Sequence, residues 1–129
     1  MKLSTMFTIA AVYEILIGLS SLVVPGPMVA AGGLQIDSTG ILMIVRFMGV
    51  ANLGLALIAW FVRKAEASTA RDGVALGFTI FFALHALTSL YGQFTDSTQT
   101  MHWFMALLQG LLAVGFFIAG KAGMSTAKA

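Results

Sequence analysis

The 129-residue sequence has no cysteine, only two prolines and few charged side chains. Without cysteine the chain cannot form disulfides, thiolate zinc sites or cysteine-held iron–sulfur clusters. Charged residues make up 9% of the chain, whereas soluble domains carry roughly 25%. Both prolines, Pro25 and Pro27, fall between apolar runs rather than inside one, so they leave those runs free to be helical.

The sequence is instead dominated by long apolar runs, with 59% hydrophobic residues and a mean hydropathy of +0.96. Each run is close to the roughly 20 residues that a helix needs to cross a bilayer. The segments between them are too short for a soluble domain. The sequence therefore predicts an all-α integral membrane four-helix bundle, a single transmembrane domain over residues 1–129 with spans at about 3–24, 41–62, 73–94 and 101–120.

The basic residues predict the orientation of these spans. All but Arg46 lie at the N-terminus, in the second loop or at the C-terminus, whereas the other two loops contain no Lys or Arg. The positive-inside rule then places both termini in the cytoplasm of a bacterial inner (cytoplasmic) membrane, in a multi-pass arrangement. This bias also accounts for the basic pI near 9.3, so no nucleic-acid partner is expected. The first run is longer than a signal-peptide core and contains Glu14, which favours a retained span.

Each apolar run carries one strongly polar residue near its centre: Glu14, Asn52, His85 and Gln109. Counted from the outer ends of the spans, all four lie about 12–17 Å deep. Polar side chains at this depth usually face each other or a wet cavity. More polar residues lie outward of this layer than inward of it. The sequence therefore predicts an outward-facing polar cavity lined by Glu14, Arg46, Asn52, His85, Ser89 and Gln109.

Small residues also recur at helix-packing spacing. Gly49 shares one side of the second run with Ala56 and Ala59, and Gly73 precedes Gly77 by four residues. Gly115 and Ala119 repeat that spacing in the last run. Such residues let helix backbones approach closely in membranes, so we expect them at helix–helix contacts.

Glu14 and Arg46 differ in predicted depth by about 7 Å, which two long side chains can bridge. An unpaired charge in hydrocarbon is costly, so the two residues are expected to pair. One interpretation is a structural ion pair that fixes the first span to the second. In the other, Glu14 binds a proton or a cation and Arg46 receives an anionic or carbonyl-bearing ligand.

His85 is open to several readings: a packed histidine, a proton carrier, or a ligand of metal or haem. His85 and His102 differ in predicted depth by about 12 Å, too far to sandwich one haem iron. No His, Asp and Glu residues have the spacing of a zinc or di-iron site, so no metal is predicted. Asn52 and Gln109 are typical of interhelical hydrogen bonds. The catalytic residues, if any, are unknown, and no cofactor is predicted beyond a bound quinone or lipid.

Segment 46–55 reads Arg-Phe-x-Gly-x-x-Asn-Leu-x-Leu. In a four-span chain of this length, this pattern resembles the DoxX-like group of small bacterial membrane proteins. The resemblance implies a four-helix bundle in which Arg46, Gly49 and Asn52 line the inner face. Some DoxX-like proteins are accessory subunits of quinone-linked oxidoreductases. The present chain lacks redox ligands, which speaks against a redox role of its own.

Segment 10–18 reads Ala-x-x-x-Glu-Ile-x-x-Gly and is similar to the first helix of the small multidrug resistance transporters. Those proteins use a membrane-embedded glutamate for proton and cation exchange. Their third-helix aromatic and glycine signatures have no counterpart in residues 74–92, so the similarity is confined to the first span.

Three functions are therefore open. The first is a non-enzymatic accessory subunit or binder of a quinone-like or lipid-like amphiphile, whose partners are membrane lipids and a larger membrane complex or a second copy of the chain. The second is a proton-coupled small-molecule transporter or channel centred on Glu14. The third is an intramembrane enzyme that uses Glu14 and His85 as acid and base on an apolar substrate.

Overall fold

The computed structural model describes residues 2–31, 39–95 and 101–126, which are helical apart from short connections and contain no strand. Four of the helices are long and apolar enough to cross a membrane, which is the composition of a multi-pass membrane protein. The prediction of an all-α chain with four long apolar helices is confirmed. The helices are α1 (Leu3–Val23), α2 (Pro25–Ala31), α3 (Thr39–Val62), α4 (Thr69–Thr95) and α5 (Met101–Thr126).

Several helix boundaries differ from the predicted spans: α4 begins four residues earlier, and α5 continues to Thr126 rather than ending near residue 120. α4 begins at Thr69 rather than at residue 73, since the Ser68 hydroxyl accepts a 3.3 Å hydrogen bond from the Arg71 backbone N–H. The second half of the predicted loop 63–72 is therefore helical. α2 begins at Pro25, where a helix needs no backbone N–H. The remaining residues of the other two predicted loops, 32–38 and 96–100, lie outside the described residues.

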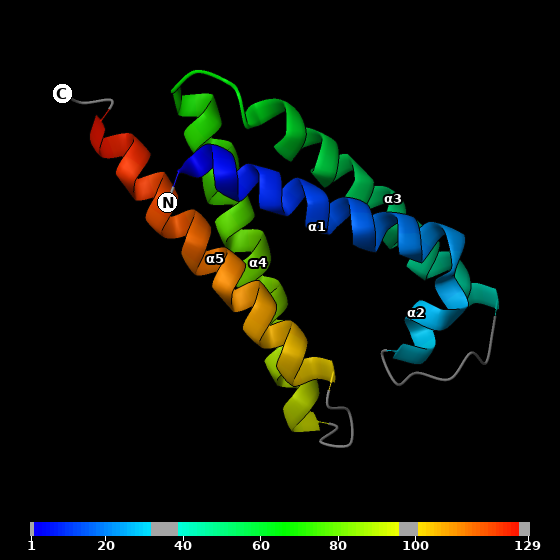
Figure 1. The fold of residues 1–129 in the computed structure, drawn as a ribbon. Coiled ribbons are helices and arrows are strands. Elements are labelled where there is room, and N and C mark those ends of the chain that lie inside the picture. The colour runs from blue at the N-terminus through cyan, green and yellow to red at the C-terminus, as the bar shows by residue number, and fades with distance from the viewer. Residues whose placement is uncertain (1, 32–38, 96–100, 127–129) are drawn as a thin grey trace.

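The four long helices are arranged as two antiparallel pairs (Figure 1). α1 packs along α3, α4 packs along α5, and the main contact between the pairs is α1 against α5. The pairs meet at the end of the molecule that holds the start of α1, the α3–α4 connection and the C-terminal part of α5. We name this the basic end, because Arg63, Lys64, Arg71 and Lys121 lie there. Toward the opposite end, which holds α2, the pairs diverge.

The buried core lies near the basic end and is built around four phenylalanines. Phe7 of α1 meets Phe116 of α5 edge to face, with ring centroids 5.3 Å apart. Phe78 of α4 stacks on Phe116 at 5.2 Å, and Phe82 lies 6.0 Å from the same ring. This phenylalanine cluster holds the two helix pairs together, because its rings come from α1, α4 and α5.

α1 and α3 approach each other most closely at Gly18 and Gly49. A Cβ atom added to Gly49 would lie 2.8 Å from the Gly18 carbonyl oxygen, closer than real side chains come. Ala56 and Ala59 continue the buried side of α3, which confirms that part of the small-residue prediction. Gly73 and Gly77 are different: a Cβ atom on either would meet nothing within 4 Å, so their spacing does not mark a helix contact.

Candidate functional site

Among the ionisable side chains in the described part of the chain, that of Glu14 is the most deeply buried. Its side chain is 1% exposed and lies on the same face of α1 as Ala10 and Gly18. The carboxyl oxygen Oε1 has no hydrogen-bond partner. A buried polar atom without a partner is costly, more so in a membrane, where water does not supply one. Such an atom is a natural point of contact for a proton or a ligand.

The predicted ion pair between Glu14 and Arg46 does not form among the described residues. The half-buried Arg46 donates instead to the Met43 sulfur of its own helix, at 3.8 Å. The close approach of α1 and α3 at Gly18 and Gly49 explains why Glu14 and Arg46 are separated. Glu14 lies one turn from Gly18 toward the basic end, whereas Arg46 lies nearly one turn from Gly49 in the opposite direction. Because α1 and α3 are antiparallel, the two side chains start about 10 Å apart along the helix axes.

Gln109 instead reaches α1 through Tyr13. Its amide Nε2 donates a 3.3 Å hydrogen bond to the Tyr13 hydroxyl, and the Gln109 side chain is 8% exposed. The Tyr13 ring also packs edge to face on Phe82, with centroids 5.9 Å apart. Tyr13 therefore links α1 to both helices of the other pair, immediately beside Glu14. Sequence reasoning missed Tyr13, although its position next to Glu14 gave a signal.

Two buried acceptor oxygens are thus left without donors, Glu14 Oε1 on α1 and Gln109 Oε1 on α5, whose amide nitrogen donates to Tyr13 beside Glu14. We name Tyr13, Glu14 and Gln109 the Glu14 site. Carboxylate and amide oxygens accept hydrogen bonds and cannot donate them. The site is therefore complementary to a group that donates hydrogen bonds.

Asn52 lies apart from this site. It is half-buried and faces a cavity of about 200 Å³ between α1, α2 and α3. The buried hydroxyl-bearing Ser21 also lines this cavity, but Glu14 does not. The other residues that line it are Ile17, Met28, Val29, Val45 and Met48. The cavity is mainly apolar, with two polar groups from facing helices.

His85 and Ser89 are half-buried on α4. The His85 ring lies against Phe81, with centroids 4.2 Å apart, and its Nδ1 is 3.0 Å from the Phe81 carbonyl oxygen. Because a carbonyl only accepts, this contact puts the ring N–H on Nδ1 and leaves Nε2 as an acceptor. Within the described ranges no hydrogen bond joins His85 to Glu14. Acid–base chemistry shared by these two residues therefore lacks a direct contact.

His102 lies at a different height along the helices from His85. Its ring covers Gly92, where an added Cβ atom would lie 3.1 Å from His102 Cε1. Gly92 is seven residues beyond His85 on α4, or about 10 Å along the axis. The two histidines therefore lie at separate heights. In the part of the chain that the structure describes, no three His, Asp or Glu side chains gather to hold a metal.

The six predicted site residues thus fall into different places. Glu14 is buried on α1, Gln109 reaches the neighbouring Tyr13, Asn52 faces a separate cavity, and the other three lie along α3 and α4. No family model, curated protein or solved structure matches the chain. The resemblance of segment 46–55 to the DoxX-like group therefore stays a prediction.

Proposed function

We propose that this protein binds one quinol-like or hydroxyl-headed lipid-like amphiphile at the Glu14 site, as a non-enzymatic subunit of a larger membrane complex. The observation that carries the proposal is the pair of buried oxygens, Glu14 Oε1 and Gln109 Oε1, that lack donors. A ligand that donates hydrogen bonds to them relieves the cost of leaving them unpaired.

The hydrogen-bonding groups of the site further restrict the class of ligand that fits it. A quinol has hydroxyl groups that donate, whereas the oxidised quinone has only acceptors, so the reduced form is the better match. A groove of about 350 Å³ between α3 and α4 offers an apolar surface for a tail. It is lined by Leu55, Ile58, Val74, Gly77, Phe78 and Phe81. His85 packs at an angle against Phe81, which lines this groove.

Glu14→Gln is expected to weaken binding of a short-chain ubiquinol by about tenfold, because the amide replaces one of the two carboxyl oxygens with an NH2 group that donates rather than accepts. The measurement is native mass spectrometry of the detergent-purified protein, titrated with the ubiquinol under reducing conditions. The wild-type protein should form a one-to-one complex with it. The oxidised quinone should bind less tightly than the quinol.

Glu66→Gln is the matched control, because it removes the same charge from an exposed position in the α3–α4 connection. It should bind the ubiquinol as the wild type does. Equal affinity in the wild type and Glu14→Gln, or no preference for the reduced form, would contradict the proposal.

The burial of Glu14 also favours a second candidate, proton-coupled transport centred on this carboxyl group. A membrane-embedded carboxyl group can exchange a proton for a cationic substrate. Proteoliposomes with an imposed proton gradient distinguish the two. Uptake of a small cation that disappears in Glu14→Gln, in a protein that retains no amphiphile on purification, would support the transporter instead.

We further propose that the protein resides in a bacterial inner membrane with the basic end in the cytoplasm. Of the described Lys and Arg residues, all except Arg46 lie at this end: Lys2, Arg63, Lys64, Arg71 and Lys121. Lys and Arg are enriched in cytoplasmic connections, which supports this orientation.

The absence of cysteine permits a direct test of orientation. In spheroplasts treated with a membrane-impermeant maleimide, Thr95→Cys at the α2 end should be labelled. Lys64→Cys at the basic end should be labelled only after permeabilisation. Both residues are exposed, so accessibility within the protein does not limit either reaction. Labelling of Lys64→Cys in sealed spheroplasts would reverse the proposed orientation.

A further inference from the structure

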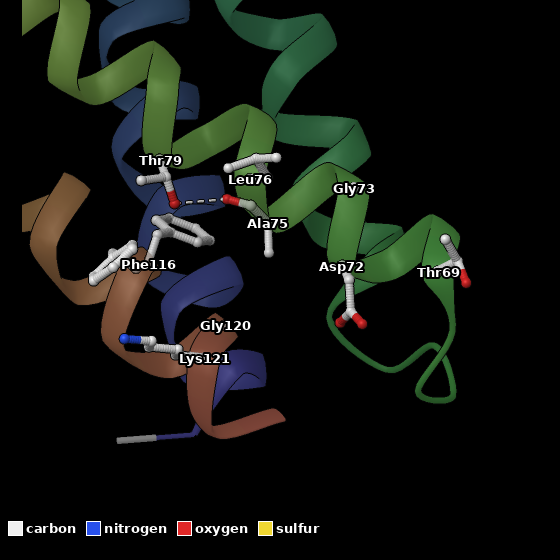
Figure 2. A pocket seen from close by; sticks show the side chains of 10 residues that line it. Thr69, Asp72, Gly73, Ala75, Leu76, Thr79, Phe116, Gly120 and Lys121 are labelled. Carbon is white, nitrogen blue, oxygen red and sulfur yellow. Dashed lines mark hydrogen bonds between the residues drawn. The ribbon is translucent and has the colours of Figure 1, made fainter. Parts of the chain in front are cut away.

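A cavity of about 340 Å³ opens between the start of α4 and the C-terminal part of α5, at the basic end (Figure 2). It shares no residue with the Glu14 site. Its walls come from two helices that pack along each other. The residues that line it are Thr69, Asp72, Gly73, Ala75, Leu76, Thr79, Phe116, Phe117, Gly120 and Lys121.

The cavity carries one charge of each sign. Asp72 of α4 and Lys121 of α5 both line it, and Figure 2 shows that their charged groups are not turned toward each other. The Lys121 ammonium lies over the Phe117 ring, 5.4 Å from its centroid. Among the described residues neither group forms an ion pair. Both side chains therefore remain available to a ligand that carries one positive and one negative charge.

The remainder of the cavity is lined mainly by apolar side chains. Phe116 is buried, while Leu76 and Phe117 are 57% and 54% exposed, with Ile80 one turn further along α4. The Thr79 hydroxyl already donates to the Ala75 carbonyl, so toward a ligand it can accept a hydrogen bond but cannot donate one. Gly73 keeps the wall open, because a Cβ atom there would meet nothing within 4 Å. The cavity thus combines a charged mouth with exposed apolar side chains along the two helices.

We propose that this cavity is a binding site for a zwitterionic phospholipid whose head group carries a primary ammonium. The ammonium binds Asp72, the phosphate binds Lys121, and an acyl chain lies along Leu76 and Phe117. An anionic lipid would satisfy Lys121 but would be repelled by Asp72. A quaternary ammonium has no N–H to donate to the carboxylate, whereas a primary ammonium has three. This site is additional to the proposed amphiphile site and does not depend on it.

The test is lipid competition measured by native mass spectrometry. The wild-type protein is released from nanodiscs that contain equal amounts of phosphatidylethanolamine and phosphatidylglycerol with identical chains. We expect one phosphatidylethanolamine retained in preference to phosphatidylglycerol by about threefold, the scale of a partly exposed charge pair. Asp72→Asn should abolish the preference. Lys121→Gln should reduce retention of both lipids, because both carry a phosphate.

Matched controls separate the site from general charge and surface effects. Glu66→Gln and Lys64→Gln change the same charges at exposed positions near the basic end and should keep the preference. Gly73→Leu should reduce retention by filling the cavity, whereas Gly54→Leu adds the same side chain at an open position on α3 and should not. Soluble glycerophosphoethanolamine should fail to compete, since it has no acyl chain.

The proposal is overturned if the wild type retains both lipids equally, or if the preference survives in Asp72→Asn. Loss of the preference in Glu66→Gln would assign it to surface charge rather than to this cavity. Effective competition by glycerophosphoethanolamine would replace the lipid with a soluble ligand. None of these outcomes bears on ubiquinol binding, which is tested with a different ligand and through Glu14→Gln.

Discussion

Gly49→Ala is expected to lower the free energy of unfolding by about 1–3 kcal/mol, the usual cost of overpacking. The added Cβ atom would lie 2.8 Å from the Gly18 carbonyl oxygen and 3.0 Å from Ser21 Cβ. The first of these atoms is backbone, so it cannot rotate away and α1 must shift from α3. Membrane helices associate largely through close packing, so this shift removes contacts along the whole pair. Unfolding in mixed micelles titrated with SDS, followed by tryptophan fluorescence, measures the change.

Gly54→Ala is the matched control on the same helix, because a Cβ atom there meets nothing within 4 Å. Alanine is a better helix former than glycine by about 0.5–1 kcal/mol. This substitution should therefore leave stability unchanged or raise it, whereas Gly49→Ala should lower it. A Gly49→Ala protein as stable as Gly54→Ala would show that α1 and α3 are not in close contact at this point.

Much of the fold could be predicted from the sequence because apolar runs of this length have few alternatives in a membrane. Helix ends were less predictable. Hydropathy places the first turn of α4, with Arg71 and Asp72, in a loop, but helix formation there depends on the Ser68 cap rather than on apolarity. The small residues of α3 were correctly placed at a contact. The same spacing at Gly73 and Gly77 was misleading, since spacing alone does not say which helix faces pack.

The candidate site was harder to predict, because depth along a helix does not determine partners. Glu14 and Arg46 appear close when only depth is counted, but the direction of the Gly18–Gly49 crossing separates them. The way in which α1 and α3 cross is a feature of tertiary structure, and the sequence around either glycine does not indicate it. Tyr13 was missed for a related reason: only the packing of α1 against α5 brings its hydroxyl to Gln109. Burial of Glu14 itself agrees with the expectation that a mid-span carboxyl group faces protein rather than lipid.

The phenylalanine cluster, which the sequence offered only as a set of ten scattered rings, leads to the second large prediction. Phe116→Ala is expected to cost about 2–3 kcal/mol, because the ring is fully buried and contacts rings from α1 and α4. In the cores of soluble proteins, Phe→Ala lowers the free energy of unfolding by roughly 3–5 kcal/mol. Part of that loss comes from the transfer of the side chain out of water, and this contribution is smaller between helices in lipid. The same SDS titration measures the loss.

Phe104→Ala is the control on α5, since Phe104 is 57% exposed and loses few protein contacts. It should change stability by less than about 0.5 kcal/mol. A double variant tests whether the cluster joins the helix pairs. Phe7→Ala and Phe116→Ala together should cost less than the sum of the single changes, because each alone already removes their 5.3 Å ring contact. Additive costs would mean that the two rings stabilise the protein independently and that their contact does not join the helix pairs.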